Sequence, residues 1–288
     1  MSPCFTRRPG LAKTKQGDML DQIMNLTLGC RRLTLQTLPA QGSMAGLRKA
    51  WNQALSFHDA HAGLFYQQRA GVPTRIIFRP VHQKATVPTL EMVLLGPQTL
   101  TDEVLFRKAW STLELNGAGR LPNHQLIRIL DWKSVDPWGN PTTDWQLEHI
   151  PLPKGHLPFR LRFSMPLSLE TGPFESAQAP TWPIIASAAM RRLAELTEST
   201  LEPDVAEWVT TQATEAGASC WHPDNDASFD SNLYSPEMMR RGIRGYIDFP
   251  NGAGPLTPIV TALPWIHVGR LIHIGMGRPI LEPIPDQT

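Results

Sequence analysis

Residues 26–57, LTLGCRRLTLQTLPAQGSMAGLRKAWNQALSF, set a strand pattern directly before a helix pattern. Residues 26–38 mix alternating polarity with β-branched side chains, which is typical of a strand. Pro39 to Gly42 predict a turn, and Ser43 is suited to cap the N-terminus of a helix that runs to residue 57. Along that helix the apolar residues step by three and four, as one buried face requires: Met44, Leu47, Trp51 and Leu55. The stretch therefore predicts a β-α unit.

The segments that follow extend this unit. Residues 75–81, 89–96 and 124–132 read as strands, and residues 101–115 read as a helix with Thr101 as its N-cap. The order is β-α-β-β-α-β, which is the ferredoxin-like arrangement and also the scaffold of the RNA-recognition motif.

A second unit of the same kind is predicted after a Pro- and Gly-rich stretch at 133–157. Residues 159–170, 242–249 and 277–284 read as strands, and residues 181–200, 204–216 and 256–266 as helices. Residues 201–241 are otherwise irregular, and one strand of the second unit is poorly marked. We predict an α+β fold of two tandem ferredoxin-like domains, at residues 19–150 and 151–288, after a flexible basic tail at 1–18.

Composition limits the function classes. The 288 residues carry 27 Lys and Arg against 26 Asp and Glu, so any basic surface for nucleic acid must be local. Three scattered cysteines do not suggest a disulfide framework. No apolar run is long enough for a membrane span, and residues 1–18 do not read as a secretory signal. We expect a cytoplasmic protein without a membrane partner.

The most informative stretch is WIHVGRLIHIGMGRPI, residues 265–280. Its glycines, Gly269, Gly275 and Gly277, permit close approach of the backbone to a phosphate. Exposed backbone N–H groups together with Arg270 predict an anion-binding concavity. The spacing matches neither a P-loop nor a Rossmann fingerprint.

This stretch resembles the glycine-rich loop of the CRISPR-associated RAMP endoribonucleases. That family's pattern is Gly-hydrophobic-Gly, a spacer with a basic residue, then Gly-hydrophobic-Gly. Here Val268-Gly269, the spacer 270–274 and Gly275-Met276-Gly277 fit, while His267 stands in place of the first glycine. The clear match covers roughly 240–281.

The resemblance implies an endoribonuclease that binds the stem-loop of a CRISPR repeat and cleaves precursor crRNA. The reaction would need no metal or cofactor: a 2′-hydroxyl attacks the adjacent phosphate and leaves a 2′,3′-cyclic phosphate and a 5′-hydroxyl. The implied partners are crRNA, whose handle stays bound, and other subunits of a CRISPR effector complex. Two rival hypotheses are a non-catalytic RAMP protein that only holds the handle, and a scaffolding subunit without RNA contact.

The family often places its histidine on or just after the first helix, where this chain has His58 and His61. Histidine suits proton transfer because its pKa lies near working pH. We expect one of the two to act as base or acid, oriented by Asp59, with Lys49 or Arg48 stabilising phosphate charge. The alternative is that a histidine simply caps the end of the helix. His267 and His273 are second candidates.

The predicted RNA contacts fall into two groups. The loop supplies His267, Gly269, Arg270, Gly275, Gly277 and Arg278. The rest of the second unit supplies Arg240, Arg241 and Arg244 around its strand, and Arg191 and Arg192 on its helix.

Two metal sites were weighed from the sequence and rejected. Cys220 and His222 lack further ligands at zinc-site spacing. Residues 224–235 resemble the start of an EF-hand loop but carry Phe229 in place of the turn glycine. We therefore expect no bound metal.

Overall fold

The computed structural model describes most of the chain in separate ranges. These are residues 15–36, 44–67, 72–81, 88–116, 127–136, 140–142, 145–146, 149–150, 157–169, 179–224, 234 and 242–284. Ser43, Arg240 and Arg241, to which the sequence assigned roles, lie outside them.

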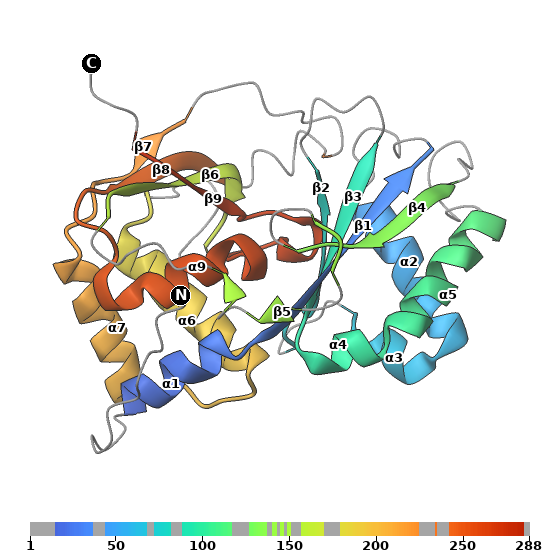
Figure 1. The fold of residues 1–288 in the computed structure, drawn as a ribbon, viewed down its shortest axis with the longest axis horizontal. Coiled ribbons are helices and arrows are strands. Elements are labelled where there is room, and N and C mark those ends of the chain that lie inside the picture. Colours follow the sequence, from blue (N-terminus) through green and yellow to red (C-terminus); the bar gives the residue numbers. More distant parts are fainter. Residues whose placement is uncertain are drawn as a thin grey trace, which may run out of the picture.

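The first unit is built on an antiparallel sheet with the strand order β2-β3-β1-β4 (Figure 1). Its strands are β1 (Thr27–Leu35), β2 (Ile76–Pro80), β3 (Thr89–Leu95) and β4 (Ile129–Ser134), and the short β5 (Trp145–Gln146) pairs with the start of β1. Helices α2 (Met44–His58) and α5 (Glu103–Asn116) follow β1 and β3 along the chain and pack on each other. This is the ferredoxin-like order that the sequence predicted.

The second unit repeats the arrangement, with the strand order β7-β8-β6-β9. Its strands are β6 (Phe159–Leu167), β7 (His222–Pro223), β8 (Ile243–Phe249) and β9 (Pro279–Glu282). Its helices are α6 (Trp182–Leu196), α7 (Pro203–Glu215) and α9 (Thr257–Ile266). The strand that the sequence marked poorly is β7, which has two residues. The predicted α+β fold with two tandem ferredoxin-like units is confirmed.

Several local predictions were wrong. Thr101 does not cap α5, because it ends the preceding helix α4 (Pro97–Thr101), where its hydroxyl donates to the Pro97 carbonyl at 3.3 Å. Strand β4 begins at Ile129 rather than at residue 124. Residues 15–18 of the predicted flexible tail belong to helix α1 (Lys15–Met24), and a further short helix, α3 (Ala60–Phe65), follows α2.

Strand β1 is buried on both faces, and this explains how the two units meet. Leu33 and Leu35 face the core under α2 and α5. Leu28 and Cys30 face the opposite way, into a core that also contains residues of the second unit and of α1. A strand at the centre of two apolar layers needs apolar residues on both faces, which is why the alternation at 26–38 is incomplete.

Buried arginines of the first sheet and of α6 connect the units. Arg79 donates to the Pro264 carbonyl at 2.8 Å, and Arg192 donates to the Ile266 and Thr74 carbonyls at 2.7 and 2.6 Å. The last carbonyls of a helix have no partner within it and carry partial negative charge, so a guanidinium satisfies them well. Because the units share one core and these bonds, the domain boundaries at 19–150 and 151–288 stay a prediction.

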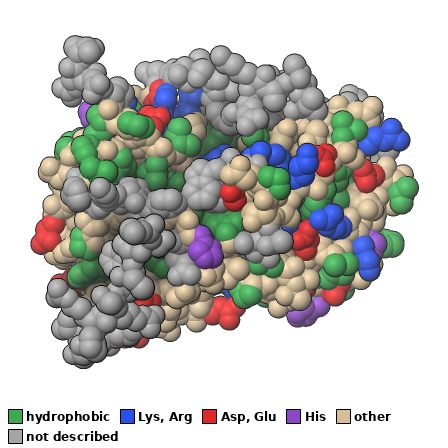
Figure 2. Space-filling view, in the orientation of Figure 1, with side chains coloured by type: hydrophobic (Ala, Val, Ile, Leu, Met, Phe, Trp, Pro, Cys, Tyr) green, Lys and Arg blue, Asp and Glu red, His purple; other side chains and the backbone are tan. Residues whose placement is uncertain are grey.

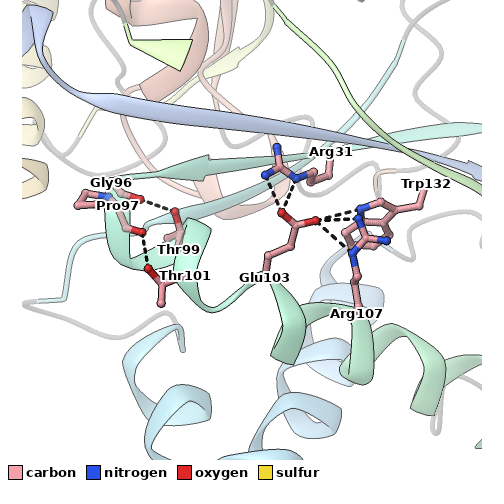
Figure 3. A network of polar contacts seen from close by, with 8 residues as sticks. All are labelled: Arg31, Gly96, Pro97, Thr99, Thr101, Glu103, Arg107 and Trp132. Atoms are coloured by element: carbon pink, nitrogen blue, oxygen red, sulfur yellow. Dashed lines mark hydrogen bonds and ion pairs between the residues drawn. The ribbon is translucent and has the colours of Figure 1, made fainter. Parts of the chain in front are cut away.

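A polar network fixes α5 against the first sheet (Figure 3). The carboxylate of Glu103 accepts from Arg31 at 2.8 Å, from Arg107 at 2.9 Å and from the indole of Trp132 at 3.3 Å. Burial raises the pKa of Glu103, but the bonds and charges of Arg31 and Arg107 outweigh it and leave that pKa below its usual value. Arg107 also lies over the Trp132 ring, 4.6 Å from its centroid.

On the surface shown in Figure 2, Lys and Arg side chains are interspersed with Asp and Glu rather than gathered in one basic area. This agrees with the balanced composition. In the described ranges, no helix combines the length and the hydropathy needed to cross a membrane.

Candidate active site

The glycine-rich loop links α9 to β9 and closes on itself. The backbone N–H of Val268 donates to the Gly277 carbonyl at 3.2 Å, and the N–H of Gly277 donates to the Pro166 carbonyl of β6 at 3.0 Å. Gly269, Gly275 and Gly277 all have positive φ. A Cβ on Gly277 would collide with the Val268 carbonyl oxygen, and one on Gly269 with the Ser168 carbonyl oxygen. Close packing of the loop on the protein's own backbone is thus enough to require these glycines.

His267 occupies the position where the family pattern has its first glycine. Its φ of 53° lies in the region that favours glycine, and its side chain is fully buried. Nδ1 lies 3.2 Å from the Met276 carbonyl oxygen. Burial, together with nearby Arg79 and Arg278, holds the pKa of His267 well below its ordinary value. His267 therefore supports the loop from inside, and we withdraw it from the predicted RNA contacts.

The centre of the loop is inserted into the first unit. Its short 3-10 turn, η6 (Ile272–Ile274), packs on β2 and α2, and Ile274 and Met276 are buried in the core under α2 and α5. The Tyr234 hydroxyl donates to the Ile274 carbonyl at 2.8 Å. These contacts place His273, a residue of the loop, against α2.

A pocket of about 280 Å³ lies where the loop meets α2. It is lined by Ala45, Arg48, Lys49, Asn52, Gln53, Ser56, Gln67 and His273. All but Gln67 and His273 come from α2. The pocket therefore combines one helix face of the first unit with one residue from the glycine-rich loop of the second.

The polar face of α2 explains the lining. Lys49, Asn52, Gln53 and Ser56 are spaced at three, four and seven residues, so they share a face opposite the buried Leu47 and Trp51. The sequence analysis singled out Lys49 and Arg48 but missed Asn52 and Gln53. The spacing of polar residues was visible, but nothing local showed that the loop at 272–274 would cover this face.

Arg48 is a buried cation at the base of the pocket. Its guanidinium donates to Asn52 Oδ1 at 2.9 Å and to the Tyr66 carbonyl at 3.0 Å, and it lies over the rings of Trp51 and Phe78. Burial lowers its pKa to about 9, so it is charged at neutral pH. Its N–H groups hold the side chain of Asn52 and the carbonyl of Tyr66 in place.

His273 is 8% exposed and lines the pocket. Burial, reinforced by the charge of Arg48, lowers its pKa to about 3. The imidazole is therefore neutral at working pH. Nδ1 is buried and has no hydrogen-bond partner among the residues that the structure describes.

No protein-family model matches the sequence, and no curated protein matches it. Solved structures do match. A Cas6 product complex superposes with a TM-score of 0.61 at 14% identity, over 88% of this chain and 99% of that one. The chain has the Cas6 fold.

Two further Cas6-containing structures share this fold. Thermus thermophilus Cas6 gives a TM-score of 0.55 at 12% identity, covering 89% of this chain and 98% of that one. A Cas6-RT-Cas1–Cas2 complex gives 0.54 at 13% identity over 91% of this chain, which corresponds to 29% of that much longer chain. This Cas6-type fold confirms the architecture expected from the glycine-rich loop.

The histidines predicted to be catalytic, His58 and His61, are not part of the pocket lining. His58 is the last residue of α2 and is exposed, with Nε2 2.7 Å from the Thr112 hydroxyl on α5. His61, on α3, is exposed and stacks on Phe65. Asp59 accepts from the Ala62 N–H at 2.9 Å as the N-cap of α3, and among the described residues no hydrogen bond joins its carboxylate to either imidazole. Of the residues predicted to act in catalysis, Lys49, Arg48 and the second candidate His273 line the pocket.

The predicted arginines separate into buried and accessible positions. Arg192 is 7% exposed, and its guanidinium joins the units, so we withdraw it from the RNA contacts. Arg191 is exposed on α6, and Arg244 and Arg270 are partly exposed. Arg278 follows the loop, and burial, with Arg79 nearby, lowers its pKa to about 9. None of these lines the pocket.

Among the described residues, no three His, Cys, Asp or Glu side chains are grouped so that they could hold a metal ion. His222, considered above as a zinc ligand, stacks on the Tyr246 ring with their centroids 4.9 Å apart.

Proposed function

We propose that this protein is a metal-independent endoribonuclease that binds the stem-loop of a CRISPR repeat and cleaves precursor crRNA. The observation that carries the proposal is the pocket between α2 and the glycine-rich loop, with Lys49 in its lining, in a chain with the Cas6 fold. Cas6 structures in this group include a product complex and a substrate mimic complex.

The pocket suits phosphoryl chemistry. Attack of a 2′-hydroxyl on the adjacent phosphate puts additional negative charge on the non-bridging oxygens, and a cation or hydrogen-bond donors near those oxygens lower the barrier. We propose that Lys49 supplies this stabilisation. His58 and His61 are the proposed proton-transfer groups, and His58 would exchange its contact with Thr112 for one with RNA.

The proposed partners follow from the same comparisons. One of the matching structures is a Cas6-RT-Cas1–Cas2 complex. We propose that this protein keeps the crRNA handle and associates through it with other CRISPR proteins. The proposed RNA contacts outside the pocket are Arg191, Arg244, Arg270 and Arg278, together with Arg240 and Arg241 outside the described residues.

The test is incubation of the purified protein with the CRISPR repeat RNA of its source genome in EDTA, with analysis of the product ends. We expect cleavage at one position that leaves a 2′,3′-cyclic phosphate and a 5′-hydroxyl. A 2′-deoxy substitution at that position should abolish cleavage. Cleavage that requires added Mg²⁺, or products with 3′-hydroxyl ends, would contradict the proposal.

A second function is favoured by one observation. Neither His58 nor His61 lines the pocket, and His273, which does, has a pKa of about 3. A pocket whose lining histidine is held in its neutral form fits a protein that holds the crRNA handle without cutting it. Tight binding without cleavage in the same experiment would support this alternative. Replacing both His58 and His61 with Ala would then leave RNA affinity unchanged.

A further inference from the structure

The pocket presents hydrogen-bond donors, and the chemistry of its neighbours determines this. Arg48 can only donate, so the amide atom of Asn52 that lies 2.9 Å from it must be the oxygen. The other amide atom, Nδ2, is left for whatever enters the pocket, and it can only donate. Arg48 therefore orients Asn52 as a donor toward the pocket.

The same reasoning applies to His273. The imidazole is neutral, so one ring nitrogen carries a proton and the other does not. Nδ1 is buried and has no hydrogen-bond partner among the described residues. A buried N–H without an acceptor is rarer and more costly than a buried lone pair without a donor, so the proton belongs on Nε2. His273 thus also directs a donor into the pocket.

The remaining lining is consistent with an anionic ligand. Lys49 adds an ammonium group, and none of the described residues in the lining carries a carboxylate. The Ser56 hydroxyl donates to the Asn52 backbone carbonyl at 2.9 Å, so its proton is already used. A volume of about 280 Å³ is small, at the lower limit of typical ligand sites, and suits one phosphate with its adjoining sugar.

We propose that Lys49, Asn52 and His273 form a phosphate site in which Nζ, Nδ2 and Nε2 donate to the non-bridging oxygens of the RNA phosphate that is attacked. Asn52 and His273 are then catalytic residues of the reaction proposed above, on which this inference rests. Arg48 is a positioning residue that acts through Asn52. Because the donors come from both units, the site exists only when the glycine-rich loop is docked on α2.

The first test measures single-turnover cleavage of repeat RNA and, separately, RNA affinity. Asn52→Asp keeps the bond with Arg48 but turns the second amide atom into an acceptor, and His273→Phe removes the donor. We expect each change to slow cleavage about 100-fold, as for the loss of one donor to a developing oxyanion. We expect the Kd of the intact repeat RNA to change much less than the cleavage rate. His273→Gln, which retains an N–H donor, should recover part of the loss.

The matched control is His149→Ala, which removes an imidazole outside the pocket and should leave cleavage unchanged. Thermal unfolding of each variant shows that it is folded. Cleavage within threefold of the unaltered protein for both Asn52→Asp and His273→Phe would overturn the proposal.

A second measurement does not depend on cleavage. The unaltered protein should bind the 5′ cleavage fragment at least tenfold more tightly with a 3′-phosphate than with a 3′-hydroxyl, because charge-assisted bonds to the phosphate are lost in the second. Asn52→Asp should abolish this preference. If the protein prefers the phosphate but does not cleave, the proposed function fails and the phosphate site stands. If it shows no preference, the phosphate site is overturned even if the protein cleaves.

Discussion

Val268 and Gly277 close the neck of the glycine-rich loop: the Val268 N–H donates to the Gly277 carbonyl at 3.2 Å, and the Val268 carbonyl occupies the space that a Cβ on Gly277 would need. His273 can contact α2 only while the Val268–Gly277 hydrogen bond holds the two ends of the loop together. A side chain at position 277 should therefore affect both stability and the pocket.

Gly277→Ala should destabilise the protein by about 3 kcal/mol or more. Its φ of 63° costs an alanine about 1 kcal/mol, and the collision with Val268 adds the remainder. Gly217 offers a matched control, because its φ is 62° and no atom lies within 4 Å of an added Cβ. Gly217→Ala should cost only about 1 kcal/mol. Chemical denaturation of both variants measures the difference, and equal losses would contradict the packing explanation.

Arg191 and Arg192 are neighbours in sequence with opposite expected roles. Arg192→Ala leaves the Ile266 and Thr74 carbonyls without their donor and should lower the free energy of unfolding by about 3 kcal/mol. Arg191→Ala should leave stability within about 0.5 kcal/mol and, as an RNA contact, reduce the slope of log affinity against log salt by about 1. Melting curves and salt titrations of RNA binding separate the two. An unchanged salt slope in Arg191→Ala would remove it from the RNA contacts.

Glu103→Gln should destabilise the protein by about 3 kcal/mol at pH 7, because Arg31, which is 3% exposed, would lose its carboxylate partner. The folded-state pKa of Glu103 lies below the usual 4.5, so its stabilisation is present above that pH and is lost as pH falls through the folded pKa. The difference between Glu103→Gln and the unaltered protein should therefore shrink below about pH 4.5. Lys133→Ala, which breaks an exposed ion pair with Asp131, should cost less than about 1 kcal/mol at either pH. A pH-independent difference for Glu103→Gln would contradict the assignment.

The dependence of Asn52 on Arg48 can be measured with a double-mutant cycle. Arg48→Lys should slow cleavage in the unaltered protein but have little further effect in an Asn52→Ala background, because Arg48 acts on the phosphate through the amide. The cycle compares single-turnover rates at saturating RNA for the unaltered protein, the two single variants and the double variant. Additive effects would mean that Arg48 acts on the RNA independently of Asn52.

The sequence predicted the architecture well because its signals are local. The apolar spacing of α2 and the alternation of β6 each lie within one element, and the strand order follows from their succession. Strand β7 was missed because two residues, His222 and Pro223, carry no periodicity. Helix α1 was not predicted, and its residues 15–18 were assigned to a flexible tail, because the helix depends on packing against α7 and α9, which lie far along the chain.

The site was predicted less completely, for a related reason. Resemblance to a family drew attention to His58 and His61, which follow the first helix, but the pocket depends on contact between α2 and residue 273. Nothing near Asn52 or His273 in sequence indicates that they meet. Arg191 and Arg192 are likewise indistinguishable until the packing of α6 buries one and leaves the other in solvent.

The face of β1 that carries Leu28 and Cys30 has a consequence for synthesis of the chain. Its cover comes largely from the second unit, including α9, which begins at Thr257. During translation this apolar face lacks part of its cover until α9 has been synthesised. Exposed apolar surface of this kind is prone to aggregation, so we expect the nascent protein to depend on chaperones until α9 has emerged from the ribosome.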